Sequence, residues 1–188
     1  QRNISKKKFP VLIDLCRVPE LQKLYLQRDG LHIGATVTYA TLLASGMVKT
    51  DYPALHGLIK LIASAQIRNF GTLAGNIANA SPVGDTLPLL MVLNAELRLQ
   101  SELELRHLPL SEFFIGYRKT ALNKHEFVKE VILPPPDRQA YIRTIKSAKR
   151  KSVDISAVIT AIYIKQENGI ISTARLALGG VAATTMLS

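Results

Sequence analysis

At residues 66–85 the chain reads QIRNFGTLAGNIANASPVGD, between two segments whose apolar spacing predicts helices. This stretch contains three glycines and three asparagines. Glycine lacks a Cβ atom and tolerates positive φ, so neighbouring backbone N–H groups can converge on an anion. Thr72, Asn76 and Ser81 add hydrogen-bonding side chains without adding charge. We therefore expect residues 66–85 to form a loop that binds a phosphate-bearing cofactor.

Helix and strand signals lie on both sides of this loop. Asp29-Gly30 lies between two apolar runs and predicts the turn of a hairpin. Pro53 is typical of the first turn of a helix, which we expect to end near Gln66. Asp85 is placed to cap the next helix, where unsatisfied N–H groups favour anions. The other elements expected in this half are a strand at 11–15, hairpin strands at 24–26 and 31–35, and a helix at 39–43 after the N-cap residue Thr38.

Strand patterns dominate the second half of the chain. Pro134 to Pro136 are expected to form a linker between its two parts, and Asn168-Gly169 is a strong hairpin-turn signal. Helices followed by an antiparallel sheet predict an α+β fold. The strands expected here are 95–100 and 103–106 as one hairpin, then 126–133, 141–147, 156–166 and 170–178.

Composition limits the class of protein. The net charge is +10, but no aromatic residues are interleaved with the basic ones for base stacking, so we do not expect nucleic-acid binding. Cys16 is the only cysteine, so the chain can build neither a disulfide framework nor a cysteine-ligated iron–sulfur cluster. The sequence has no apolar run of roughly 20 residues and no signal peptide, so we expect a cytoplasmic protein without a membrane span. His32, His56, His107 and His125 lack metal-ligand spacing, and we predict no catalytic or metal-binding residue.

Three stretches of the chain resemble the motifs of a known family. Arg68 to Asp85 resembles its flavin-binding signature, R-N-x-G-T-x-G-G-N-I-x-x-A-S-P-x-x-D. Gly116 to Thr120, with Glu130 to Pro134 downstream, resembles a Y-R-K-T…E-I-x-x-x-I-x-x-P run, and Lys146 to Ser156 resembles K-x-x-x-R-x-x-x-D-I-A. The family is the FAD-binding domain or subunit of the molybdenum hydroxylases, such as xanthine dehydrogenase, the CO dehydrogenase medium subunit and the nicotinate dehydrogenase FAD subunit. The resemblance extends from Phe9 to Gly180.

The resemblance implies the FAD-binding fold of the PCMH/CO-dehydrogenase flavoprotein type, with mixed and antiparallel sheets and flanking helices, truncated at both ends. Residues 1–136 would be the remainder of the FAD-binding lobes, with the glycine-rich flavin loop at 66–85. Residues 137–188 would be an antiparallel β segment that completes the flavin site and leads to a missing C-terminal subdomain. A second glycine-rich loop, of the A-G-G-T/S type, would lie outside this sequence and supply half of the pyrophosphate site.

The resemblance also implies which residues contact the cofactor. Asn76 would contribute its side chain as well as its backbone, and Asn79 and Ser81 would bind phosphate or ribose. Without the resemblance, the same residues would be interpreted as a glycine-rich turn that merely joins two helices. The residues whose backbone amides would line the cofactor are Thr72, Leu73, Ala74, Gly75 and Asn76.

Further contacts are implied outside the centre of the loop. Asp85 would accept a hydrogen bond from a ribityl or ribose hydroxyl, in addition to capping a helix. Ile62 and Val128 match apolar positions that pack on the cofactor, although either could be an ordinary core residue. Lys146 matches a lysine near the isoalloxazine ring, where a cation favours the reduced flavin; alone it would be interpreted as a solvated side chain. The segment from Arg150 to Asp154 would lie beside the flavin.

The function implied is that of the FAD-binding component of a molybdenum-hydroxylase-type oxidoreductase. It would relay electrons from [2Fe-2S] clusters of a partner to NAD⁺ or another acceptor, with the molybdopterin also on a partner subunit or domain. The alternative is a non-catalytic or degenerate flavin-fold module for cofactor delivery or assembly. A basic nucleic-acid-associated domain ranks third, because only the net charge favours it.

Overall fold

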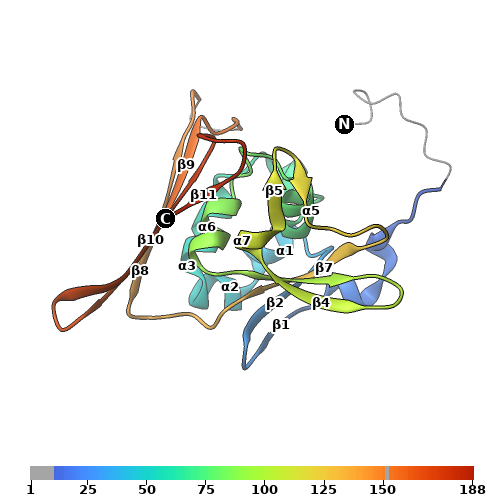
Figure 1. Cartoon of the computed structure of the whole chain (residues 1–188), viewed down its shortest axis with the longest axis horizontal. Coiled ribbons are helices and arrows are strands. Elements are labelled where there is room, and N and C mark those ends of the chain that lie inside the picture. The colour runs from blue at the N-terminus through green and yellow to red at the C-terminus, as the bar shows by residue number, and fades with distance from the viewer. Residues whose placement is uncertain (1–10, 151–152) are drawn as a thin grey trace.

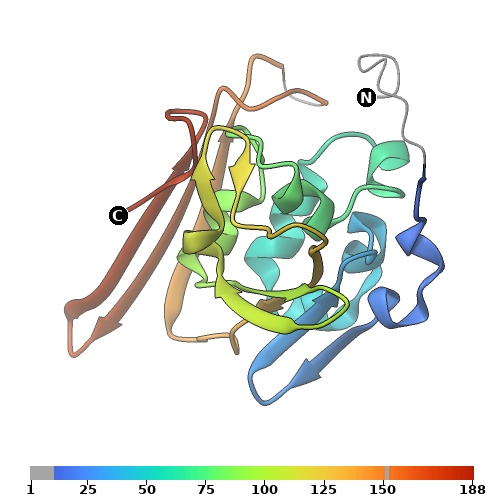
Figure 2. The ribbon, with the colours of Figure 1, turned by 45° about the vertical axis from the view of Figure 1, so that its right-hand side comes forward.

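Two antiparallel sheets enclose a layer of short helices (Figure 1). The computed structural model describes residues 11–150 and 153–188, so the start of the expected resemblance at Phe9 lies outside the described residues. Figure 2 shows the same arrangement from a second direction, with the orange-red C-terminal sheet on the left of the helices and the larger sheet below them. This separation of sheets and helices agrees with the α+β class expected from the sequence.

The larger sheet has the strand order β1-β2-β7-β3-β4, and every neighbouring pair is antiparallel. Arg28 and Asp29 form the turn that joins β1 to β2, and Gly30 is the first residue of β2, so the first expected hairpin is confirmed with its turn one residue earlier. Gly30 has a φ of +132°, and a Cβ atom there would lie 1.9 Å from the carbonyl oxygen of Leu133, so only glycine fits. The strands are β1 Leu24–Gln27, β2 Gly30–Gly34, β3 Glu96–Gln100, β4 Leu105–Pro109 and β7 Phe127–Leu133.

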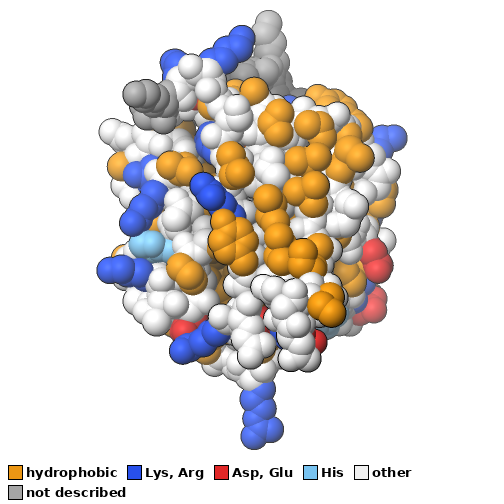
Figure 3. All heavy atoms as spheres, turned by 90° about the vertical axis from the view of Figure 1, so that its left-hand side faces the viewer, with side chains coloured by type: hydrophobic (Ala, Val, Ile, Leu, Met, Phe, Trp, Pro, Cys, Tyr) orange, Lys and Arg blue, Asp and Glu red, His pale blue; other side chains and the backbone are white. Residues whose placement is uncertain are grey.

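The second sheet has the order β11-β10-β9-β8 and comes after the three prolines. Asn168 and Gly169 have φ values of 53° and 81°, as the expected two-residue turn between β9 and β10 requires. Figure 3 shows hydrophobic side chains on the outer face of this sheet, where Tyr141, Ile145 and Leu176 are exposed. The strands are β8 Ala140–Ser147, β9 Val158–Glu167, β10 Ile170–Gly179 and β11 Met186–Leu187.

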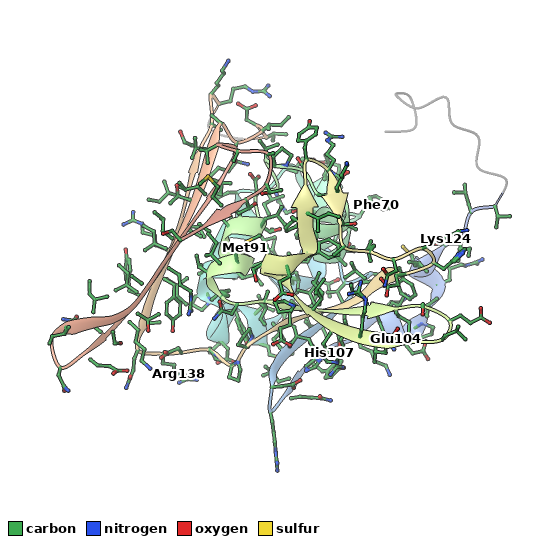
Figure 4. All side chains as sticks on the ribbon, viewed as in Figure 1. Phe70, Met91, Glu104, His107, Lys124 and Arg138 are labelled. Atoms are coloured by element: carbon green, nitrogen blue, oxygen red, sulfur yellow. The ribbon has the colours of Figure 1, made fainter. Side chains whose placement is uncertain are left out.

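Short helices fill the space between the sheets. Thr38 caps the first of them through a hydrogen bond from the backbone N–H of Thr41, as expected. All six residues of α6 are buried; it contacts β9 and β10, and Met91 is one of its buried residues (Figure 4). The helices are α1 Tyr39–Ala44, α2 Gly46–Asp51, α3 Pro53–Lys60, α4 Ala65–Arg68, α5 Leu73–Ala78, α6 Leu87–Val92 and α7 Leu110–Phe113. The remaining elements are the 3-10 turns Leu15–Arg17 and Pro19–Gln22 and the small hairpin β5 Phe114–Gly116 and β6 Lys119–Thr120.

Three local expectations were wrong. The strand at 11–15 does not form: residues 11–14 have no regular structure, and the Asp14 side chain caps a 3-10 turn instead. The helix that begins at Pro53 ends at Lys60, because Ala63 adopts a left-handed φ of 46°. Asp85 does not cap α6, whose N-cap residue is Thr86 with no side-chain bond, because other donors engage the Asp85 carboxylate.

Residues 66–85 are not one continuous loop. The end of α4 and the whole of α5 lie within them, since Thr72 provides an N-cap for the helix after it. Among the residues described, none of the helices is long and apolar enough to cross a bilayer.

Candidate functional site

A groove of about 1010 Å³ runs along the glycine-rich segment. One wall is formed by residues between Ile67 and Asp85, and Tyr39 and Ile62 line it from neighbouring parts of the helical layer. The opposite wall is the loop before β9, represented by Arg150 and residues 153–155. We call this the glycine-rich groove. It is the point where the helical layer meets the second sheet.

The helix α5 decides which residues of the glycine-rich segment reach the groove. Thr72, Gly75 and Asn76 line it, whereas the side chains of Leu73 and Ala74 point into the core, at 0% and 4% exposure. The backbone N–H of Gly75 donates to Thr72 Oγ1 at 2.9 Å, and that of Asn76 donates to the Thr72 carbonyl at 3.0 Å. Two of the five amides expected to face a cofactor are therefore used inside the helix.

Several polar groups that line the groove have no hydrogen bond to other described residues. Asn76 Oδ1 accepts a hydrogen bond from Thr86 Oγ1 at 2.8 Å, which fixes the orientation of the amide. Asn76 Nδ2 and the side chains of Asn79 and Ser81 have no hydrogen bond within the described part of the chain, and all three residues line the groove. The segment therefore offers several free hydrogen-bonding groups on one surface.

Tyr39 contributes a buried hydroxyl that the sequence analysis did not identify. The residue is 4% exposed and lines the groove. Its hydroxyl is buried and makes no hydrogen bond of ordinary geometry among the described residues, and the Thr86 side chain is near enough to lower its pKa, a smaller effect than that of burial. Burial raises the pKa of Tyr39 far above its ordinary value, so the hydroxyl stays protonated and remains a donor. No local sequence signal marks this residue, because it lies in the first turn of α1 and reaches the groove only through packing against Gly71.

Asp85 is held between two donors from the C-terminal part of the chain. Lys146 Nζ lies 2.6 Å from Asp85 Oδ2 and also donates to the Leu61 carbonyl at 3.3 Å. Ser156 Oγ donates to Asp85 Oδ1. The side chains of Lys146 and Asp85 are only 9% and 14% exposed. We call Asp85, Lys146 and Ser156 the Asp85 clamp; in it, the charge of Lys146 is paired rather than free.

The loop before β9 closes on itself. Arg150 donates from its backbone N–H to Asp154 Oδ2 at 2.9 Å and from its guanidinium to Asp154 Oδ1 at 3.1 Å. The Arg150 hydrogen bonds lower the pKa of the Asp154 carboxyl, so it stays ionised. Val153 and Ile155 are 53% and 72% exposed and line the groove, as does Phe70, a surface residue that is 85% exposed (Figure 4). The groove therefore has an apolar rim.

Ile62 and Val128, the two apolar residues predicted to pack on the cofactor, lie in different surroundings. Ile62 is 8% exposed and lines the groove. Val128, in β7, is 5% exposed and belongs to the hydrophobic core, and it is not part of the groove lining. The structure thus brings seven predicted residues together on the groove wall: Ile62, Thr72, Gly75, Asn76, Asn79, Ser81 and Asp85.

A second cavity, of about 560 Å³, lies between α3, the three prolines and β8. Charged side chains in its lining pair with neighbours: Arg138 lies 3.3 Å from Asp51, and Asp137 accepts a hydrogen bond from Tyr163 at 3.0 Å. None of the residues predicted from the sequence lines this cavity. The glycine-rich groove is therefore the candidate functional site.

Known proteins resemble this chain in sequence. Xanthine dehydrogenase of Oryza sativa subsp. japonica is 35% identical over 199 residues, covering 98% of this chain and 14% of that protein. The nicotinate dehydrogenase FAD-subunit of Eubacterium barkeri is 31% identical over 177 residues, covering 93% of this chain and 60% of that protein. The chain thus spans less than two thirds of either relative.

Solved structures share the fold. A carbon monoxide dehydrogenase from Hydrogenophaga pseudoflava matches with a TM-score of 0.86 and 29% identity, covering 91% of this chain and 59% of that chain. Quinoline 2-oxidoreductase from Pseudomonas putida 86 matches with a TM-score of 0.85 and 28% identity, covering 93% of this chain and 60% of that chain. These matches confirm the flavoprotein fold expected from the sequence.

Two family models cover nearly the whole chain. The CO dehydrogenase flavoprotein C-terminal domain matches residues 143–188. The FAD binding domain in molybdopterin dehydrogenase matches residues 1–136, a range that contains the glycine-rich segment and most of the groove wall. The resemblance inferred from the motifs is thereby confirmed. The chain belongs to the family of FAD-binding domains of molybdopterin dehydrogenases.

Proposed function

We propose that this protein is the FAD-binding component of a molybdenum-hydroxylase-type oxidoreductase, and that the glycine-rich groove holds the cofactor. A bound flavin would supply the redox chemistry. The chain's own residues would bind and orient it, and none of them needs to act as an acid or a base.

The observation that carries the proposal is a set of unmatched hydrogen-bonding groups facing an open groove. Tyr39 borders the same groove, with its hydroxyl buried below the groove surface and next to Thr86. The Asn76 amide and the Asn79 and Ser81 side chains face the same space. The phosphates, ribityl chain and adenosine of FAD present acceptors and hydroxyls along one extended molecule, which fits such a row of groups.

The proposed contacts depend on where each residue lies. Asn76, Asn79 and Ser81 would hydrogen-bond to phosphate or sugar oxygens, and Ile62 would pack against the ring system. Asp85 would accept from a hydroxyl with the lone pairs that the clamp leaves free. Lys146 would act through Asp85, since it does not line the groove. Leu73, Ala74 and Val128 would support the wall from the core, since none of the three lines the groove.

Partners and domain division belong to the same proposal. We propose that iron–sulfur and molybdopterin groups reside on partner subunits or domains, that NAD⁺ or another acceptor takes the electrons, and that the protein acts in the cytoplasm. The names of the relatives support this, since those proteins include a nicotinate dehydrogenase FAD-subunit and a glyceraldehyde dehydrogenase medium chain. A division into 1–136 and 137–188 is supported by the two separate family matches.

The test is the visible spectrum and FAD affinity of the native protein, in the full-length polypeptide that contains this chain. We expect oxidised-flavin absorbance or uptake of added FAD. Asn79→Trp would fill the groove and raise the FAD Kd more than about tenfold. The matched control is Asn69→Trp: both asparagines are exposed C-cap residues with nearly the same backbone angles (φ −69°, ψ −18° and φ −70°, ψ −16°), but Asn69 does not line the groove.

A wild-type protein that neither contains flavin nor takes up FAD would contradict the proposal. Equal loss of FAD binding in the Asn79 and Asn69 variants would place the site elsewhere. A protein that binds FAD in the groove but does not pass electrons when assembled with its partners would instead support the alternative role in cofactor delivery.

A further inference from the structure

We propose that Ser156 is a positioning residue of the glycine-rich groove, and that its hydroxyl fixes the Asp85 carboxylate, which in turn sets the affinity for FAD. This inference rests on the proposed function. Ser156 stands where the family pattern that Lys146 to Ser156 resembles has alanine. The hydroxyl is therefore a feature of this chain that the resemblance does not imply.

The first step of the argument is the geometry of the Asp85 carboxylate. Each of its oxygens has one donor: Lys146 Nζ at 2.6 Å from Oδ2, and Ser156 Oγ on Oδ1. A carboxylate held at one oxygen can still rotate about its Cβ–Cγ bond, whereas donors on both oxygens fix its plane. Ser156 is 4% exposed, so water cannot readily replace its hydroxyl. Removing the hydroxyl would therefore leave Oδ1 without a donor and the carboxylate free to turn.

The second step is the path of the chain on either side of Ser156. Asp154 and Ile155, just before it, line the groove, and Ala157, just after it, donates its backbone N–H to the Ser147 carbonyl at 2.8 Å. Ser156 is thus the residue at which the loop wall joins the sheet. Through Asp85 its hydroxyl connects this wall to the glycine-rich wall.

The third step separates Ser156 from the groove lining itself. Asp85 lines the groove, but Ser156 and Lys146 do not. Any effect of Ser156 on a ligand in the groove must therefore pass through Asp85 or through the loop. If it passes through Asp85, the effect disappears when the carboxylate is absent, which a double-mutant cycle measures directly.

The experiment measures FAD Kd for the full-length protein and four variants: Ser156→Ala, Asp85→Ala, the double variant, and Ser147→Ala as the control. Ser147 follows Lys146 in β8 and its side chain is exposed, so its variant makes the same chemical change beside the clamp without removing a clamp side chain. We expect Ser156→Ala to raise the Kd about tenfold, as for loss of a hydrogen bond to a charged group. In the Asp85→Ala background, Ser156→Ala should change the Kd less than about twofold.

Hydrogen exchange of the FAD-free protein provides a second readout. We expect Ser156→Ala to speed exchange in residues 153–157 and around Asp85, and Ser147→Ala to leave it unchanged. A wild-type Kd equal to that of Ser156→Ala would overturn the inference while leaving the proposed function intact. A tenfold effect in both backgrounds would overturn it too, because Ser156 would then act independently of Asp85. Absence of FAD binding by the wild type would instead refute the proposed function itself.

Discussion

Two clusters of charged side chains in this protein differ in what they face. The His32 cluster, made of Tyr25, Asp29, His32, Arg98 and Glu130, spans four neighbouring strands of the larger sheet. His32 is 0% exposed, with its ring nitrogens 3.0 Å from Glu130 Oε2 and 2.8 Å from Asp29 Oδ1. Carboxylate oxygens only accept, so both contacts are hydrogen bonds when the ring carries both protons.

The partners within the His32 cluster use almost all of its hydrogen-bonding groups. Tyr25 Oη donates to Glu130 Oε1 and Arg98 Nη1 donates to Glu130 Oε2, both at 2.9 Å, and Arg98 Nε is the one atom of the five side chains that is buried without a partner in the described structure. The Asp85 clamp has similar burial and similarly short contacts, but it borders an open groove with further unpaired groups. The comparison teaches that buried charge alone does not mark a binding site. Unmatched polar groups around a cavity do.

The largest expected effect is a loss of stability when the His32 cluster is broken. Glu130→Ala removes the acceptor shared by three side chains and leaves the partly buried Arg98 guanidinium without this carboxylate, so we expect unfolding free energy to fall by about 3–5 kcal/mol. FAD Kd, measured at a temperature at which the variant is folded, should stay within about twofold. Urea denaturation gives the stability, and Glu96→Ala, an exposed residue of β3, is the control. A large change in Kd would mean that the two clusters are coupled.

The ion pair between Arg106 and Glu126 predicts how acid affects the stability of the fold. Hydrogen bonds from Arg106 lower the pKa of Glu126 from 4.5 to about 2. This carboxylate therefore stabilises the fold fully above pH 4.5, and the contribution, about 2 kcal/mol, is lost as the pH falls from 4.5 toward 2. Urea midpoints at pH 6, 4 and 3 should show the loss in the wild type and a smaller one in Glu126→Gln. The same pH dependence in both would rule out Glu126 as the source.

For the Asp85 clamp we expect the opposite result, a small loss of stability and a large change in FAD Kd. Asp85→Ala removes the acceptor for Lys146 and Ser156. We expect a loss of about 1–2 kcal/mol in unfolding free energy, because deleting a side chain that lines the groove opens a path for water to the freed groups. FAD Kd should rise more than about tenfold. Thermal unfolding and flavin titration measure the two quantities. A stability loss as large as that of Glu130→Ala, with normal FAD binding, would make Asp85 a structural residue only.

The smallest expected effect is a gain in stability on removal of the Tyr39 hydroxyl. Tyr39→Phe removes a buried hydroxyl that has no protein partner among the described residues, so the FAD-free protein should become more stable by about 1 kcal/mol. The same variant should change the FAD Kd less than about twofold, because the hydroxyl has almost no accessible surface toward the groove. Thermal unfolding with and without FAD measures both. Lower stability without FAD would show that the hydroxyl has a partner within the protein.

Local sequence signals were sufficient for much of the fold. Asp29-Gly30 and Asn168-Gly169 predicted their hairpins because Gly30, Asn168 and Gly169 adopt the positive φ that these tight turns require. Thr38 and Pro53 predicted the starts of α1 and α3 for equally local reasons. The strand predicted at 11–15 was wrong, because a strand also needs a neighbouring strand and the sequence does not show which strands pair.

The candidate site was predicted only in part. The composition of residues 66–85 pointed to residues that form one wall of the groove, but α5 turns Leu73 and Ala74 into the core and uses the amides of Gly75 and Asn76. Helical periodicity in a stretch so rich in glycine and asparagine is weak, so this division was not visible beforehand. Tyr39 reaches the site from a separate helix well before the glycine-rich segment, and Ser156 lies 71 residues after the carboxylate it contacts.

The sequence by itself determined the family, the turns, most of the strands and one wall of the groove, because each depends on residues close together in the chain. The tertiary structure decided that Lys146 is paired rather than free, that Asp85 binds two donors rather than capping a helix, and that Tyr39 borders the groove. The physical reason is that a charge or a hydroxyl acts through the groups that surround it. Those surroundings are assembled only when the second sheet packs against the helices.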